Sequence, residues 1–155
     1  MAIKISSTTV ITDGRALTNI TTGSFSSTVD VGGINMADNT LSRPYILDYA
    51  LFHNVLGTGS GGRTIDLTLG NYVSATVNGV TTWTFSNPPA SARAGGFVLE
   101  LTNGGSATQN WPAGVTKWPG GTAPTLTASG VDVLTFITDD GGTTWRGMVS
   151  MLDSK

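Results

Sequence analysis

The side chains that could carry chemistry are few and scattered. His53 is the only histidine, so any Ser-His-Asp arrangement would have to use it, and it lies in an apolar stretch without a nucleophile motif nearby. Glycoside cleavage requires two carboxylates, but Glu100 is the single glutamate and is predicted to lie on a strand face. The sequence therefore predicts no catalytic residues, and we expect a protein that is not an enzyme.

Asp139 and Asp140, followed by two glycines, are the best candidates for a cation site. Carboxylates beside glycines can present oxygen ligands to Ca²⁺, but only two such ligands are visible here, and Asp-Asp-Gly-Gly is common turn chemistry. The absence of cysteine excludes disulfides and thiolate metal sites. We expect a turn at this position, and no metal or other cofactor.

Three tryptophans, Trp111, Trp118 and Trp145, lie near predicted loops. Exposed indole faces can bind sugar rings, which would make these residues a carbohydrate platform. The alternative is packing, because a buried aromatic ring removes about 150 to 250 Å² from water. Trp111 and Trp118 each precede a proline, and Trp-Pro steps belong at corners or sheet edges. We favour packing and keep the carbohydrate platform as the alternative.

The elements that would position these residues are mostly strands. From Arg63 onward, apolar and polar residues alternate with a period close to two, which predicts strands with one face in a core. Asn78-Gly79 lies between two such runs and predicts a tight hairpin turn. Val131–Thr138 is apolar on both faces, which predicts a central strand or a strand whose second face meets another subunit. Its hairpin partner, Thr143–Met151, is expected to follow the Asp-Asp-Gly-Gly turn.

These patterns predict an all-β fold, with an antiparallel β-sandwich or jelly-roll-like body over residues 41–155 and at most one short helix. The helix is expected within residues 43–56, where Pro44 could occupy the first helical position and aromatic residues recur at near-helical spacing. A buried strand would fit the same segment. The glycine-rich run at 57–62 is expected to be a flexible connector.

Residues 1–40 carry apolar side chains thinly among Ser, Thr and Gly. Such a segment cannot close a core of its own. It is either a flexible arm or an extended arm that neighbouring chains order through strand addition or intertwining about a threefold axis. The apolar residues expected to serve this assembly arm are Ile3, Ile5, Val10, Leu17 and Ile20.

Composition narrows the classes of partner. The 155 residues suffice for one ordinary domain with a core, and 39% of them are apolar. Only 12% are charged, about half the usual fraction, which suits a protein packed against copies of itself or a partner. A formal net charge of −2 disfavours nucleic acid. No apolar run has the length of a signal peptide or membrane span, so we expect a soluble, cytoplasmically made product without a membrane partner.

A series of motifs resembles, in the same order, a terminal domain of bacteriophage virion proteins, especially from phages of marine and other aquatic bacteria. The resemblance covers roughly residues 40 to 155. A shorter segment, Ala2–Thr22, is similar to elements near the trimeric shafts of phage fibre and appendage proteins. The motifs of the longer resemblance are Arg43-Pro44 with Leu47-Asp48-Tyr49, IDLTLGN (65–71), TTWTFSNPPAS (81–91), GGFVLELTNGGS (95–106), NWPAGV (110–115), WPGGTAPTLTASGVDVLTF (118–136), DDGGTTWRG (139–147) and Leu152-Asp153.

The resemblance implies a structural protein on the surface of a phage particle, made in the host cytoplasm and assembled as a homotrimer. It would bind the major capsid protein or another virion protein. Two placements fit, a capsid decoration (cement) protein or a head fibre, and the short chain without a repetitive shaft favours decoration. The alternative function is a tail-fibre or receptor-binding module that recognises host-surface carbohydrate.

Overall fold

The computed structural model describes residues 47–155, and the structural statements below concern this part of the chain. The predicted assembly arm, residues 1–40 with Ile3, Ile5, Val10, Leu17 and Ile20, lies outside it. Within residues 47–155, no helix has the length and apolar character needed to cross a membrane. The elements are β1 (His53–Asp66), η1 (Leu67–Leu69), β2 (Tyr72–Ser86), β3 (Gly95–Thr102), η2 (Gly104–Ser106), β4 (Gln109–Asn110), β5 (Thr116–Lys117), η3 (Pro119–Gly121), β6 (Val131–Thr138) and β7 (Trp145–Met151), where η denotes a short 3₁₀ turn.

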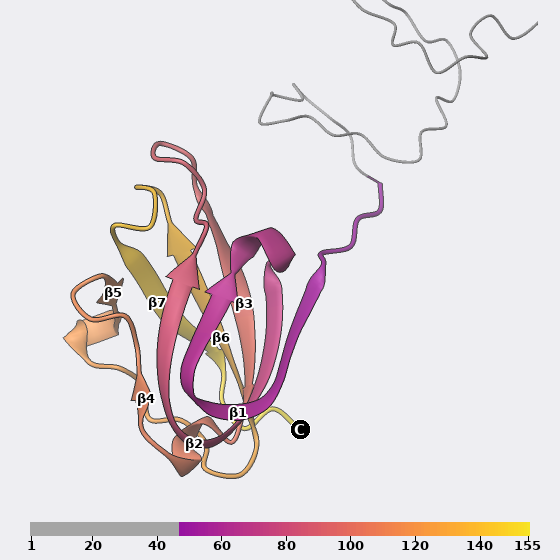
Figure 1. The fold of residues 1–155 in the computed structure, drawn as a ribbon, viewed down its shortest axis with the longest axis vertical. Coiled ribbons are helices and arrows are strands. Elements are labelled where there is room, and N and C mark those ends of the chain that lie inside the picture. Colours follow the sequence, from indigo (N-terminus) through magenta and orange to yellow (C-terminus); the bar gives the residue numbers. More distant parts are fainter. Residues whose placement is uncertain (1–46) are drawn as a thin grey trace, which may run out of the picture. The chain divides into compact units, whose positions relative to one another are not determined.

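β1 and β2 are the two longest strands, and each runs down one side of the body, bends at the bottom and returns upward (Figure 1). They pair in parallel along their whole length, from His53 beside Tyr72 to Asp66 beside Ser86. Gly57 and Gly61, with φ angles of 69° and 75°, lie where the register shifts, and glycine adopts such angles at little cost. Because β2 bends, its first half pairs with β3 and its second half pairs with β4.

The bend explains how two parallel strands are joined by the short segment 67–71. A parallel pair ordinarily needs a connection of a dozen or more residues. Here β1 ends close to where it begins, since a Cβ added to Gly70 would collide with the carbonyl oxygen of Phe52. Asp66 starts the connection by accepting hydrogen bonds from the backbone N–H and the hydroxyl of Thr68, at 2.9 and 2.7 Å.

The large sheet has the order β1-β2-β3-β6-β7-β5, and β4 adds to β2 beside this path. The pairs β3–β6 and β6–β7 are antiparallel, whereas β1–β2, β2–β3, β2–β4 and β5–β7 are parallel. The predicted all-β sandwich is confirmed. The predicted antiparallel pairing holds only for β3, β6 and β7, because the bends in β1 and β2 allow parallel neighbours without long crossovers.

The core lies between the two halves of the bent strands. Alternate residues of the first half of β2, of β3 and of β6 are buried, as a period of two requires. Phe85, on the returning half of β2, lies 4.9 Å from Phe97 and 5.1 Å from Phe136, measured between ring centroids. The buried apolar residues are Ile65, Val73, Ala75, Val77, Trp83, Phe97, Leu99, Leu101, Leu134, Phe136 and Trp145.

The prediction of a helix within residues 43–56 is wrong for residues 47–56, the part of this segment that the structure describes. Residues 47–52 have no regular structure, and β1 begins at His53. Tyr49 and Phe52 are exposed, so the apolar stripe expected of a helix has nothing to pack against. A short helix without such packing is marginal in water, whereas the strand pairs with β2 from its first residue.

The predicted connector at 57–62 and the predicted hairpin at Asn78-Gly79 are also wrong, for one shared reason. Both lie inside strands, at the bends of β1 and β2, and neither Asn78 nor Gly79 has a positive φ. The two halves of β2 pair with β3 and β4 rather than with each other, so no tight turn forms. At the bend the strands are close, because a Cβ added to Gly79 would lie 3.1 Å from Cβ of Ser60.

The turn at Asp139-Asp140-Gly141-Gly142 joins β6 to β7 as predicted. The carboxylate of Asp140 accepts hydrogen bonds from the backbone N–H of Thr144 at 2.8 Å and from the hydroxyl of Thr138 at 3.0 Å. Gly141 and Gly142 supply the positive φ angles of the turn. The hydrogen bond from the N–H of Thr144 is the main cause that lowers the pKa of Asp140.

Asp140→Ala is expected to destabilise the protein near neutral pH and to destabilise it less in acid. A carboxylate whose pKa is lowered by folding stabilises the folded state above its unfolded pKa of about 3.9, and this contribution is lost as pH falls through the folded pKa. Urea unfolding of the variant and the parent at pH 7 and pH 3 measures the difference. Asp48→Ala, at an exposed position before β1, is the control. An equal loss of stability at both pH values would contradict the prediction.

Candidate functional site

The outer face of the large sheet carries exposed apolar side chains from neighbouring strands. Residues of β3, β6 and β7 that alternate with the core point away from it, and the strand register places Thr135 between Val98 and Met148. Ile137, Met148 and Met151 remain 43%, 39% and 54% exposed. These exposed apolar side chains share the face with polar residues such as Thr135, and apolar side chains gathered on one face are a feature of interaction sites.

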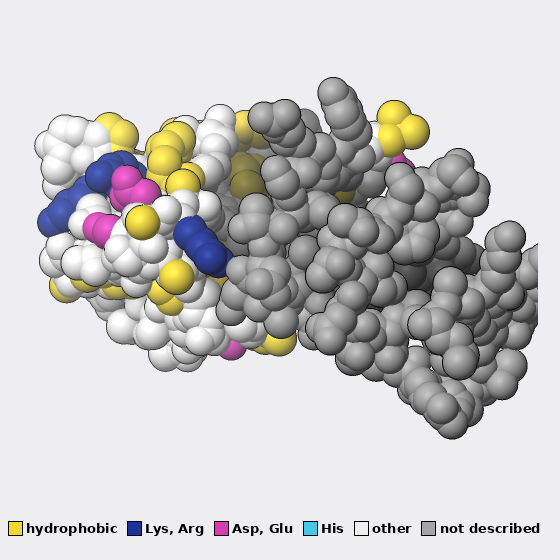
Figure 2. All heavy atoms as spheres, turned by 90° about the horizontal axis from the view of Figure 1, so that it is seen from above, with side chains coloured by type: hydrophobic (Ala, Val, Ile, Leu, Met, Phe, Trp, Pro, Cys, Tyr) yellow, Lys and Arg dark blue, Asp and Glu magenta, His cyan; other side chains and the backbone are white. Residues whose placement is uncertain are grey.

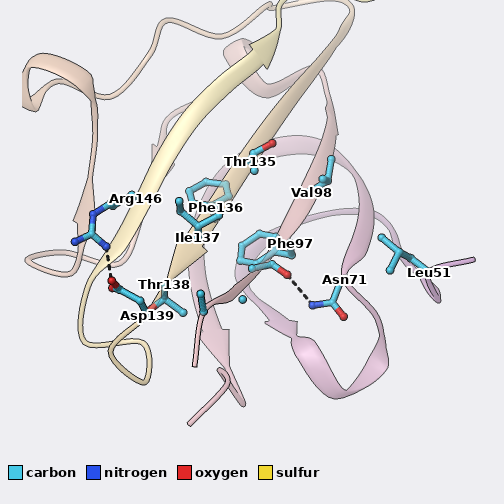
Figure 3. A pocket seen from close by; sticks show the side chains of 13 residues that line it. Leu51, Asn71, Phe97, Val98, Thr135, Phe136, Ile137, Thr138, Asp139 and Arg146 are labelled. Carbon is cyan, nitrogen blue, oxygen red and sulfur yellow. Dashed lines mark hydrogen bonds and ion pairs between the residues drawn. The ribbon is translucent and has the colours of Figure 1, made fainter. Parts of the chain in front are cut away.

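A groove of about 730 Å³ opens on this face (Figure 3). Leu51, from the segment before β1, lies at one side of it, Val98 of β3 and Ile137 of β6 line it, and Asp139 and Arg146 lie at the other side. The walls thus come from parts of the chain that are far apart in sequence. Its lining is predominantly apolar, which fits the side chains of a protein partner better than a strongly polar ligand.

The charges beside the groove neutralise each other. Nη1 of Arg146 lies 3.0 Å from Oδ1 of Asp139, and both side chains are more than half exposed. An exposed ion pair of this kind contributes roughly 0 to 1 kcal/mol to stability and is weakened by salt. Figure 2 views the end of the body where the β6–β7 turn lies, and basic and acidic side chains lie next to each other there, among mostly uncharged atoms. The groove therefore presents no net charge to a partner.

The floor of the groove depends on glycine. A Cβ added to Gly96 would collide with the carbonyl oxygen of Phe136, so only glycine allows β3 and β6 to pair this closely. Nδ2 of Asn71 donates a hydrogen bond to the carbonyl oxygen of Gly96 at 2.6 Å, which fixes the entry to β2 against this strand. In the sequence, the Gly95-Gly96 pair ahead of FVLEL was the only sign of this close approach between strands. The local sequence could not show which strand approaches it, because that depends on the pairing of β3 with β6.

The structure separates the three tryptophans of the predicted carbohydrate platform. Trp145 is 2% exposed and packs with Phe85 and Phe97 in the core. Because its ring has no free face, the assignment of Trp145 to a carbohydrate platform is wrong. Trp111 and Trp118 do meet, with centroids 5.5 Å apart, and both are partly buried. Trp111 is also stacked on Trp83 at 5.8 Å, so much of the indole surface is occupied by other rings.

The polar candidates are placed as follows. His53 Nε2 lies 2.8 Å from Oγ of Ser74 on the surface, and no carboxylate within residues 47–155 is hydrogen-bonded to this histidine. Glu100 accepts a hydrogen bond from the Tyr72 hydroxyl at 2.7 Å, which is the main cause that raises the pKa of Tyr72. Among the described residues, no group of three His, Cys, Asp or Glu side chains could hold a metal ion. The contact between His53 and Ser74 could not be predicted from the sequence, because the two residues are far apart in the chain.

The fold and this surface define an all-β sandwich whose outer sheet face carries an apolar groove beside the Asp139–Arg146 ion pair. No protein-family model, curated protein or solved structure matches the chain.

Proposed function

We propose that this chain is a non-catalytic structural protein of a bacteriophage particle, a homotrimer that decorates or stabilises the capsid as a cement or head-fibre protein. The observation that carries the proposal is the exposed apolar face of β3, β6 and β7 with its neutral groove. Such a face fits the surface of another virion protein, with the major capsid protein as the first candidate. The low charge of the chain supports the same reading, because buried unpaired charges would oppose assembly.

The proposed mechanism is multivalent attachment. Each copy removes apolar surface from water, at about 25 cal/mol per Å², and three linked copies hold more tightly than one because the second and third contacts are intramolecular. A decoration protein would thereby bridge neighbouring coat subunits. The number of copies per particle, measured by quantitative mass spectrometry of purified virions, tests the placement. Hundreds of copies support capsid decoration, whereas a handful would overturn the decoration placement and indicate a tail or fibre.

Ile137→Lys combined with Met148→Lys is expected to weaken attachment to particles by at least about tenfold while leaving the fold intact. Both side chains are exposed, so the charges cost little in the free protein but would be buried at the proposed contact. Co-sedimentation with particles that lack the protein measures attachment, and the melting temperature reports the fold. Val80→Lys, at a 56% exposed position in the bend of β2, is the matched control. Normal attachment of the double variant would contradict the role of this face.

The alternative function, recognition of host-surface carbohydrate, keeps one specific observation in its favour. Trp111 lines a second cavity of about 420 Å³ together with Thr108, Gln109 and Thr125. No charged side chain lines this cavity, which suits a neutral sugar. The Gln109 amide, however, is already engaged by Trp83 Nε1 and by the carbonyl oxygens of Gly104 and Ala107. The outer sheet face therefore carries the stronger argument.

A further inference from the structure

Only two asparagines in this chain, Asn78 and Asn103, precede a glycine. At such a step the backbone nitrogen of the glycine can attack the side-chain amide carbon of the asparagine, because glycine has no Cβ to block the approach. Asparagine is accordingly among the thermally labile residues of proteins. The reaction also requires a main chain that can move, so the tertiary structure decides which of the two steps reacts.

The Asn78-Gly79 step lies at the bend of β2, between the paired parts of the strand. The register with β1 skips residues 78–80, which lie opposite the single residue Ser60. On the other side of β2, β3 pairs only as far as Thr76 and β4 pairs only from Thr81. The step is therefore flanked by strand ladders without being part of one, and its main chain has more freedom than the strand on either side.

The side chain of Asn78 is also free to rotate toward the main chain. It is exposed, and its amide has no hydrogen-bond partner among residues 47–155. The hydroxyl of Thr81 donates a hydrogen bond to the carbonyl oxygen of Gly79 at 3.0 Å, and not to this amide. The attack therefore breaks no side-chain contact of Asn78, and water has access to the product.

The Asn103-Gly104 step is held on both sides. The backbone N–H of Asn103 donates a hydrogen bond to the carbonyl oxygen of Gly130 at 2.8 Å, and Oδ1 of Asn103 accepts one from the N–H of Gly130 at 3.3 Å. Gly104 is buried, and a Cβ added to it would lie 2.9 Å from side-chain carbons of Leu101 and Leu126. Movement of the Gly104 nitrogen onto the Asn103 amide would disrupt this packing and these hydrogen bonds.

We propose that Asn78 is a site of spontaneous deamidation in the folded protein and that Asn103 is protected. The backbone nitrogen of Gly79 bonds to Cγ of Asn78 and loses its proton to solvent, while the bond from Cγ to the side-chain nitrogen breaks and ammonia leaves. Water then adds to one of the two carbonyl carbons of the resulting succinimide ring and opens it to aspartate or isoaspartate at position 78. Because the reaction needs only water, it does not depend on the proposed phage role.

Tryptic peptide mapping of the full-length protein tests this site, because residues 64–93 and 94–117 form separate tryptic peptides that contain one Asn-Gly step each. After incubation of the folded protein in mildly alkaline buffer, mass spectrometry is expected to show deamidation at Asn78 at least about tenfold faster than at Asn103. In urea, where the tertiary contacts are lost, the two rates are expected to agree within about twofold.

Asn78→Gln is the matched variant, since it keeps an exposed amide whose longer side chain closes a ring less readily. It is expected to remove the modification from the 64–93 peptide and to leave the 94–117 peptide unchanged. Equal rates at Asn78 and Asn103 in the folded protein would overturn the proposal. So would an Asn78 that reacts in urea but stays intact in the folded protein, or a modification of the 64–93 peptide that persists in the variant.

Discussion

Trp111→Ala is expected to lower the free energy of unfolding by about 3 kcal/mol. The indole stacks on Trp83 and lies 5.5 Å from Trp118 and 5.4 Å from Phe136, so its removal leaves a cavity shared by three other rings. The loss should be near the lower end of the range for buried tryptophan, because Trp111 is only partly buried. Urea unfolding followed by near-ultraviolet circular dichroism measures both the stability and the packing of the remaining rings.

The same position distinguishes packing from carbohydrate binding. Trp111→Phe keeps an aromatic ring in the stack and is expected to recover more than half of the lost stability, because most of the ring contacts are preserved. If the carbohydrate function were correct instead, Trp111→Ala would abolish binding to host-cell polysaccharide with little change in unfolding. Unchanged stability together with lost binding would therefore overturn the packing assignment.

Arg63→Met is the second variant with a large expected effect, also about 3 kcal/mol. The guanidinium donates hydrogen bonds to the carbonyl oxygens of Leu56, Gly57 and Thr76 at 2.8 to 3.0 Å, and it lies 5.6 Å from the centroid of Trp83. Methionine would keep the aliphatic packing but leave three carbonyl groups at the bend of β1 without this donor. Chemical unfolding at pH 7 measures the loss.

Arg146→Met is the matched control for Arg63→Met, since it removes the same guanidinium from an exposed ion pair with Asp139. Its expected cost is below about 1 kcal/mol. Similar losses for the two variants would show that the network around Arg63 does not hold the bend.

The strands with the clearest alternation were predictable from sequence. Gly95–Thr102 alternates with a period close to two and Val131–Thr138 is a continuous apolar run bounded by turn residues, and in the structure alternate residues of both are buried. The Asp-Asp-Gly-Gly turn was predictable for the same local reason, because Asp140 and the two glycines satisfy its geometry by themselves. These features depend on residues close together in the chain.

The helix within 43–56 and the hairpin at Asn78-Gly79 show where local patterns mislead. Asn-Gly favours a tight turn only if the flanking strands pair with each other, and here they pair with β3 and β4. The apolar spacing before His53 favours a helix only if a surface is present to cover it, and Tyr49 and Phe52 are exposed. In both cases the partner, rather than the segment, decides the conformation.

The sequence by itself determined that this chain forms a weakly charged, strand-rich body with aromatic residues near its predicted corners, because alternation, turn chemistry and charge content are local properties. Only the tertiary structure decided that β1 and β2 bend back, that Trp145 is buried, and that Leu51, Val98 and Ile137 share a groove. The physical reason is that strand pairing joins residues far apart in the chain. The face that a strand side chain finally presents depends on which neighbours it pairs with.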